Sequence, residues 1–295
     1  MINQISGKLI RDLLPKRATD ATKFTNGYVS VVGGSIDFPG AVRLASHAAA
    51  KIGAGGVIAL IPESIRHTTG AFLPEIIVWE LKEYHGHLTH ASAFEKVDKA
   101  HDNSKAILIG CGMGREEETI LFIKDCLSHI TKPCVIDADA LYALGVLGEK
   151  FILERPHRQW TLTPHAGEFE RLLTAFGYVF DQNIAQKLAV KWQCTLVLKG
   201  APTMIYLPNG DCFENPTGNP AATTAGCGDV LAGIIAGLLA QGLSSEHAAI
   251  AGMYIAGKAA DEYVKTYKFH SLLASDIIDW LPLMLRIFND IEEEK

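Results

Sequence analysis

Short runs of apolar residues alternate with longer helical patterns along almost the whole chain, and this alternation restricts the possible folds more than any other feature. Strands are predicted over residues 28–32, 57–61, 76–79, 106–109, 134–136, 160–163, 195–198 and 204–207. Helices are predicted over residues 39–52, 116–130, 229–241, 246–264 and 274–288. Several strand segments are apolar at every position, as expected of strands that are buried on both faces. The sequence therefore predicts an α/β fold with a mostly parallel central sheet and helices on both faces.

No feature of the sequence divides the 295 residues into separate units. It contains no Ser/Pro-rich linker, no block of like charges and no repeat of fixed period. Hydrophobic residues make up 48% of the chain, which is ample for a packed core and excludes a disordered protein. A hairpin is predicted over Tyr206–Glu214, with Pro208–Asp211 as its turn. We predict one domain over residues 1–295.

Charge and hydropathy exclude several classes of function. The 27 basic and 33 acidic side chains give a net charge of −6, so the chain has no general attraction to nucleic acid or to an anionic membrane. The longest run of apolar residues and glycine, Val230–Ala240, is shorter than the roughly 20 residues that a bilayer helix needs. The N-terminus lacks the pattern of a signal peptide. A cytoplasmic protein without nucleic-acid or membrane partners is expected.

Cysteine and histidine spacing gives no metal or disulfide motif. The cysteines lie apart, without a C-x-x-C pair, at Cys111, Cys126, Cys134, Cys194, Cys212 and Cys227. Buried thiols in a reducing compartment are favoured over a disulfide framework or a zinc site. His85, His87 and His90 lack nearby carboxylates, so this segment is predicted to be a solvated loop.

Glycine-rich or polar turns follow most of the predicted strands. Ligands in an open α/β sheet bind beyond the carboxyl ends of the strands, so these turns are expected to meet at one edge of the sheet. They are Gly33–Ser35, Gly110–Gly114, Asp137–Ala140, Pro164–Glu168 and Lys199–Thr203, joined by Gly218–Pro220 and Ala225–Asp229 before the next helix.

The turn that ends in Asp229 is the most informative. Small residues let the backbone approach a ligand, and free N–H groups at the start of a helix bind anions. A carboxylate beside such an anion site would repel phosphate unless it acts as a general base for a hydroxyl in phosphoryl transfer. The alternative is an N-cap or first-turn acid on a buried helix.

Two familiar nucleotide signatures are not satisfied. The sequence has no G-x-x-x-x-G-K-[ST], which excludes a Walker-type loop. Gly110, Gly112 and Gly114 follow a strand as in a dinucleotide-binding fingerprint, but Arg115 stands where the third glycine of that fingerprint belongs.

In order, the turns read G-G-S…F-P-G-A, G-x-G-x-G, D-A-D-A-L, L-T-P-H-x-G-E, K-G-A-x-T and N-P…A-G-C-G-D-V-L-A-G. This series resembles the NAD(P)H-hydrate dehydratase family of the ribokinase-like superfamily, from about Lys23 to Asp261. The resemblance implies a ribokinase-like three-layer sandwich. It also implies a repair enzyme that uses ADP or ATP with Mg²⁺ to dehydrate the S-epimer of hydrated NADH or NADPH (NADHX or NADPHX). The C6 hydroxyl would be phosphorylated, and phosphate would then be eliminated.

The resemblance also implies roles for individual residues. Asp229 would be the catalytic base. The substrate would be bound by Ala41, Gly112, Gly114 and His165 together with Asp229. The adenine nucleotide would be bound by Lys199, Gly200, Ala201, Pro202 and Thr203 and by the loop of Gly226, Cys227 and Gly228, whose N–H groups would hold the phosphoryl oxygens. Metal candidates are Asn219 and Asp137, with Asp139 beside them.

Purely structural roles are the alternative for three of these residues. The alternative for Asp137 is a strand-end cap, for His165 a helix-entry residue satisfied by backbone, and for Lys199 a surface lysine. The sequence departs from the family pattern at Ala225, Cys227 and Cys111, where the family commonly has Gly, Thr and Pro.

For the whole chain, the alternatives are a vitamin-precursor kinase of the same superfamily, and a nucleotide-sensing protein that has lost catalysis. The family commonly forms tetramers, and the predicted helix over residues 39–52 is either an interface or ordinary cover for the sheet. About 22 residues precede Lys23, so the epimerase that family members are often fused to is expected to be a separate chain.

Overall fold

The computed structural model describes residues 2–89, 94–155, 158–268 and 271–289. Its strands are β1 (Ile2–Gln4), β2 (Tyr28–Val32), β3 (Gly56–Pro62), β4 (Ile77–Leu81), β5 (Glu83–Tyr84), β6 (His87–Leu88), β7 (Ala106–Ile109), β8 (Cys134–Ile136), β9 (Trp160–Leu162), β10 (Thr195–Leu198), β11 (Thr203–Tyr206) and β12 (Cys212–Asn215). Its α-helices are α1 (Gly7–Leu13), α2 (Pro39–Lys51), α3 (Arg66–Phe72), α4 (Phe94–Asn103), α5 (Glu117–His129), α6 (Ala138–Leu147), α7 (Glu149–Leu153), α8 (Ala166–Ala175), α9 (Ile184–Trp192), α10 (Cys227–Ala240), α11 (Ser245–Tyr267) and α12 (Ala274–Asn289).

A sheet of ten strands forms the middle layer, in the order β1-β12-β11-β10-β9-β8-β7-β2-β3-β4. Neighbouring strands are parallel from β10 through to β4, whereas β11 is antiparallel to both β10 and β12. The predicted α/β fold with a mostly parallel sheet is confirmed. The predicted hairpin is also confirmed, although its first strand covers 203–206 rather than 204–207.

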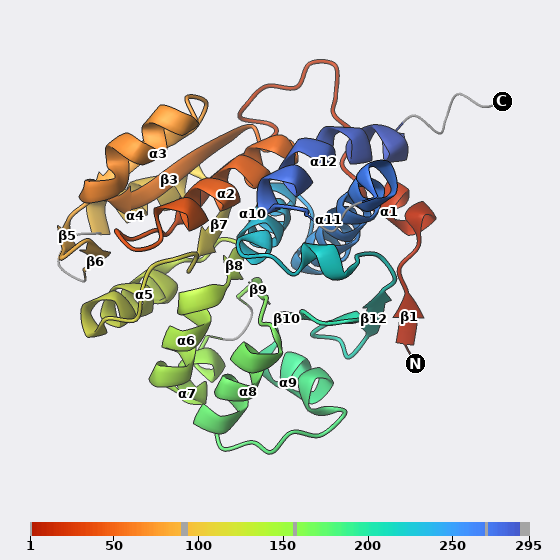
Figure 1. Ribbon diagram of the computed structural model, residues 1–295. Helices are drawn as coiled ribbons and strands as arrows, with labels where there is room; N and C mark the ends of the chain where they lie inside the picture. Colours follow the sequence, from red (N-terminus) through yellow and green to blue (C-terminus); the bar gives the residue numbers. More distant parts are fainter. Residues whose placement is uncertain (1, 90–93, 156–157, 269–270, 290–295) are drawn as a thin grey trace.

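Each face of the sheet carries a separate hydrophobic core. One core packs α1, α2, α10, α11 and α12 against the sheet, and the other packs α4 to α9. Figure 1 shows these two helical layers on opposite sides of the strands. In β3, Val57, Ala59 and Ile61 face the first core, while Ile58 and Leu60 face the second. This alternation explains why the strand is apolar at every position.

Helix α2 covers the sheet with the face that carries Val42, Ala45 and Ala49, all of them fully buried. It lies against α10, α12 and β3. The alanine-rich face of the predicted helix over 39–52 is therefore used within the chain itself. Among the described residues, no helix is both long enough and apolar enough to cross a bilayer.

Helices α2 and α10 approach closely because glycines of α10 face α2. A Cβ at Gly233 would lie 2.2 Å from the Ala45 carbonyl oxygen. Gly233→Ala is therefore expected to lower the free energy of unfolding by about 2–3 kcal/mol, since backbone must move to admit the methyl group. Gly70→Ala is the matched control, because a Cβ at this exposed glycine of α3 would meet nothing within 4 Å. Urea unfolding of both variants measures the difference, and equal stabilities would contradict this packing.

Candidate active site

The turns at the carboxyl ends of β7, β8 and β10 meet the first turn of α10. Asp137 directly follows β8, Lys199 directly follows β10, and Cys111 lies two residues beyond β7. Asp229 is the third residue of α10, which contacts both β7 and β8 (Figure 1). The predicted convergence of turns at this edge is confirmed for these four residues.

Asp137 and Lys199 form a buried ion pair. Lys199 Nζ donates to Asp137 Oδ1 at 2.9 Å and lies 3.9 Å from Glu168 Oε2. Burial lowers the pKa of Lys199, but Asp137 and Glu168 outweigh it, so the pKa of the ammonium is raised and it stays charged. Lys199 is therefore not a surface lysine. Asp137 caps no helix with its side chain, because its carboxylate is paired with Lys199.

Asp229 lies beside this pair. The Cys111 Sγ and one carboxylate oxygen from each of Asp137 and Asp229 lie within 4.8 Å of one another. Burial raises the pKa of Asp229 from 3.8 to about 6, and the charge of Asp137 also raises it, whereas Cys111 and Lys199 lower it. A carboxylate with this pKa is ionised at neutral pH yet basic enough to accept a proton from a bound hydroxyl.

The start of α10 provides room beside these charges. A Cβ at Gly228 would lie 3.4 Å from Lys199 Nζ, so the lack of a side chain at Gly228 leaves space next to the Lys199 ammonium. Gly226 is the N-cap residue, with a left-handed φ of 90°. First-turn N–H groups have no acceptor within their own helix and can bind an anion. The Cys227 N–H already donates to the Thr224 carbonyl at 3.3 Å. Asp229 is thus a first-turn acid and not the N-cap.

Ala41, in the first turn of α2, adjoins the loop after β7 that holds Gly112 and Gly114. A Cβ at Gly112, where φ is +65°, would lie 2.8 Å from the Cβ atoms of both Ala41 and Phe38. The Gly114 N–H donates to Asp139 Oδ2 at 2.9 Å. Asp139 also accepts from Arg115 Nε at 3.1 Å, so its two oxygens hold the loop in place.

His165 is the N-cap of α8. Its Nδ1 accepts from the N–H groups of Gly167 and Glu168, and the Glu168 side chain accepts from the His165 N–H in return. The helix-entry interpretation is thus confirmed for Nδ1. The side chain is 55% exposed, and its Nε2 lies 3.6 Å from Glu168 Oε1.

The loop after Lys199 is closed by a side chain. The Thr203 hydroxyl accepts from the Gly200 N–H at 3.2 Å and donates to the Gly200 carbonyl at 3.0 Å. Gly200, Ala201 and Pro202 are exposed, whereas Thr203 is buried. This arrangement presents the backbone of the loop, and not the threonine hydroxyl, to a ligand.

Asn219 is held by other partners. Its Oδ1 accepts from the Ala221 N–H at 3.0 Å, and its Nδ2 donates to Asp261 Oδ1 of α11 at 2.9 Å. Asp261 also accepts from the Gly218 N–H. The sequence did not point to Asp261, because a pairing across 42 positions leaves no local pattern.

Sequence reasoning also missed Cys111 and His87. Cys111 is buried in the core as predicted, and its Sγ also lies within 4.8 Å of a carboxylate oxygen of Asp229. His87 was assigned to a solvated loop, which is wrong: its Nδ1 lies 3.2 Å from the Met113 carbonyl oxygen, and its ring packs against Gly114. His85 is exposed, as expected, and His90 lies outside the described residues.

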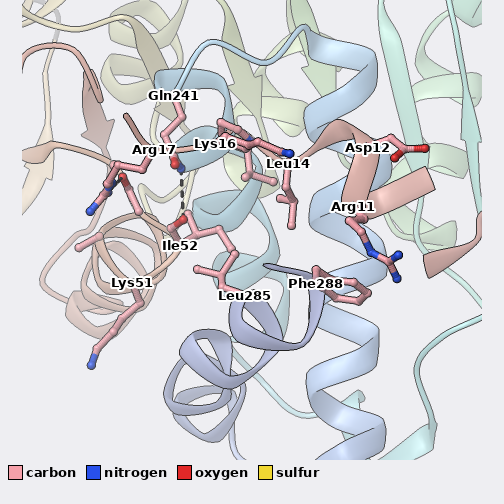
Figure 2. A pocket seen from close by; sticks show the side chains of 15 residues that line it. Arg11, Asp12, Leu14, Lys16, Arg17, Lys51, Ile52, Gln241, Leu285 and Phe288 are labelled. Carbon is pink, nitrogen blue, oxygen red and sulfur yellow. Dashed lines mark hydrogen bonds between the residues drawn. The ribbon is translucent and has the colours of Figure 1, made fainter. Parts of the chain in front are cut away.

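A hollow of about 960 Å³ lies at the opposite ends of α2 and α10, away from this cluster. Figure 2 shows its walls, where Gln241 Nε2 donates to the Ile52 carbonyl oxygen. Arg17 is engaged with the Gly53 carbonyl, and Lys51 points away from Arg11 in this view. In this view, the labelled basic side chains around the hollow do not converge on one point.

Comparison with known proteins agrees with this geometry. A family model described as NAD(P)H-hydrate dehydratase matches residues 29–283. A bifunctional NAD(P)H-hydrate repair enzyme of Moorella thermoacetica is 39% identical over 96% of this chain and 53% of its own length. An ADP-dependent (S)-NAD(P)H-hydrate dehydratase of Neisseria meningitidis is 37% identical over 83% of this chain and 80% of its own length. The chain spans about half the length of the bifunctional relatives that it matches.

A solved structure extends the agreement to the fold. The ADP/ATP-dependent NAD(P)H-hydrate dehydratase of Bacillus subtilis, co-crystallised with ATP/Mg²⁺, superposes with a TM-score of 0.79 at 29% identity, covering 98% of this chain and 99% of that one. The expected ribokinase-like fold is thereby confirmed. With the family match over residues 29–283 and the ordered turns around Asp229, this chain belongs to the NAD(P)H-hydrate dehydratase family.

Proposed function

We propose that this chain converts the S-epimer of hydrated NADH or NADPH back to NADH or NADPH, using ADP or ATP as phosphoryl donor. The observation that carries the proposal is a partly buried carboxylate, Asp229, at the first turn of α10 beside the Asp137–Lys199 pair. The names of the relatives from Neisseria meningitidis and Bacillus subtilis support the same substrate and donors.

The proposed chemistry converts the C6 hydroxyl, a poor leaving group, into a phosphate, which is a good one. Hydroxide leaves a carbon badly, whereas phosphate leaves well. Asp229 takes the proton of the C6 hydroxyl as that oxygen attacks the terminal phosphorus of the nucleotide. The C6–O bond then breaks, phosphate departs with the substrate oxygen, and loss of the C5 proton restores the reduced nicotinamide. ADP yields AMP, and ATP yields ADP.

Two groups of residues hold the reactants in this proposal. The Lys199–Thr203 loop and the first-turn N–H groups of α10, those of Gly228 above all, bind the nucleotide phosphates. The hydrated dinucleotide lies over Ala41, Gly112 and Gly114, with His165 Nε2 at its edge. Glycine at position 112 lets this loop pack closely against the start of α2, because a larger residue would collide with Phe38 and Ala41.

The donor set fits Mg²⁺, which binds through one or two carboxylates together with phosphate oxygens. Within the described residues, Asp137 is hydrogen-bonded to Lys199 through Oδ1, which leaves Oδ2 for a metal. Of the candidates Asp137 and Asn219, Asp137 fits better, since both polar groups of the Asn219 amide already have protein partners. Bound there, Mg²⁺ would neutralise charge on the phosphates during transfer.

Three further assignments belong to the proposal. The longer relatives carry the word bifunctional in their names, which supports a second repair activity beside this one. We assign that activity to an epimerase that supplies the S-epimer.

The described cysteines are free thiols, which fits the reducing cytoplasm. A homotetramer is the assembly we expect, and light scattering at working concentration tests it.

The pH dependence follows from Asp229. Because its pKa is raised to about 6, the base is protonated and inactive below that pH and ionised above it. We expect kcat/KM for hydrated NADH to fall about tenfold for each pH unit below about 6. A profile that stays flat down to the ordinary range of aspartate would contradict the assignment of Asp229 as the base.

Product analysis tests the proposed function against its kinase alternative. Purified protein is incubated with hydrated NADH, Mg²⁺ and either ADP, ATP or no nucleotide. We expect the near-ultraviolet absorbance of reduced nicotinamide to rise only when a nucleotide is present, with the faster donor identifying the preference. A flat trace with folded, nucleotide-binding protein would contradict the proposal, and phosphorylated vitamin precursors would then be sought.

A further inference from the structure

Cys111 differs from the other buried cysteines in what its thiol faces. Cys126, Cys134 and Cys194 are buried within the core that packs α4 to α9. The Cys111 side chain is fully buried, and its Sγ lies within 4.8 Å of carboxylate oxygens of both Asp229 and Asp137. The thiol therefore lies next to the proposed base.

The Cys111 backbone is fixed on the opposite side. Its carbonyl accepts from the Gly34 N–H at 2.8 Å. A Cβ at Gly33 would lie 2.6 Å from the same carbonyl oxygen, so the turn after β2 lies tightly against it. Because β7 and β2 are paired neighbours in the sheet, this contact fixes the position of Cys111 at the strand ends.

In the part of the chain that the structure describes, the charged groups around Asp229 do not donate a hydrogen bond to it. The Lys199 ammonium donates a hydrogen bond to Asp137, and Glu168 is its second acidic neighbour. Asp137 and Asp139 are themselves acidic and repel Asp229. Cys111 is fully buried beside two carboxylates, surroundings that favour the neutral thiol, so its S–H can act as a donor.

We propose that Cys111 is a positioning residue for the base, whose S–H donates to one oxygen of Asp229 and leaves the other oxygen for the substrate hydroxyl. Its catalytic consequence rests on the proposed function, whereas the hydrogen bond itself does not. The Asp229 carboxylate, in the first turn of α10 next to Gly228, is free to rotate about its side-chain bonds, and a donor fixed to the sheet restricts that rotation.

Infrared spectroscopy tests the contact without activity. The S–H stretch of Cys111 is identified by its loss in Cys111→Ala, and the Cys194→Ala variant identifies the band of a buried thiol in the core. We expect the Cys111 band at lower wavenumber than the Cys194 band, and Asp229→Ala to move it upward. Asp229→Asn provides a second variant in which a weaker acceptor gives a smaller shift. A band unmoved in both Asp229 variants would overturn the proposal.

Kinetics tests the consequence. Cys111→Ala is expected to lower kcat about tenfold, as for loss of one hydrogen bond to a charged group, with the KM for nucleotide nearly unchanged. Cys111→Ser, which keeps a donor, should recover most of that loss, and Cys194→Ala should behave as wild type. Equal rates in Cys111→Ser and Cys111→Ala would overturn positioning. A wild-type protein without dehydratase activity would instead refute the proposed function, and the infrared shift would still decide the contact.

Discussion

The Asp229→Asn variant is expected to keep its fold and to lose turnover by a factor of about 10² to 10⁴, the usual loss when a general base is removed. Asparagine has nearly the same volume and still accepts a hydrogen bond, but it cannot take a proton from the C6 hydroxyl. Steady-state rates of nucleotide-dependent formation of reduced nicotinamide measure the effect. Retention of more than about a tenth of the wild-type rate would show that another group is the base.

Two controls separate lost chemistry from lost structure. Asp211→Asn changes an exposed aspartate in the β11–β12 turn and should leave turnover unchanged. The stability of Asp229→Asn is the second control. Because the folded-state pKa of Asp229 is about 6 against an ordinary 3.8, ionisation destabilises the fold, and this loss grows as pH rises through that interval. The variant should therefore be at least as stable as wild type above pH of about 6.

Lys199→Met is expected to lower the free energy of unfolding by about 3 kcal/mol, because it leaves the Asp137 carboxylate buried without its partner. Asp137 is 2% exposed, while the Lys199 side chain is 19% exposed, which places the loss at the lower end for a buried pair. Urea unfolding at neutral pH gives the value. The methionine occupies similar volume, so lost packing adds little.

The double variant Asp137→Asn/Lys199→Met isolates the charge effect. Removing both charges leaves no uncompensated carboxylate, so the double variant should recover a large part of the stability lost in Lys199→Met. Additive losses would contradict the interpretation of this pair as a coupled unit. Nucleotide binding should remain weak in both variants, because each lacks the ammonium next to Gly228.

The sequence predicted the centre of the sheet better than its edges. Strands over 106–109, 134–136 and 195–198 have the predicted bounds, because burial on both faces leaves a run of almost entirely apolar residues. The edge strand β4 covers 77–81 rather than 76–79, and four of its five positions are at least partly exposed. Strand β1 was missed entirely, because its side chains are all exposed and its backbone bonds to β12 define it.

At the candidate site too, some features could be predicted from the sequence and others could not. The order of the turns predicted that Asp137, Lys199 and Asp229 would meet, because parallel strands bring their carboxyl ends together. Side-chain pairings across elements could not be predicted, since composition and spacing do not encode them. Asp261 holds Asn219 from α11, and the thiol of Cys111 meets Asp229 from another loop. A cysteine that the sequence predicts to be buried is therefore not necessarily an inert residue of the core.

Following the substrate oxygen tests the central claim most directly. Hydrated NADH carrying a heavy oxygen isotope in its C6 hydroxyl is incubated with the protein, Mg²⁺ and unlabelled nucleotide, and the released phosphate is analysed by mass spectrometry. If Asp229 activates that hydroxyl for phosphoryl transfer, each released phosphate carries one heavy oxygen. Unlabelled phosphate, with the isotope recovered in water, would show that the C6–O bond breaks without phosphorylation and would contradict the account.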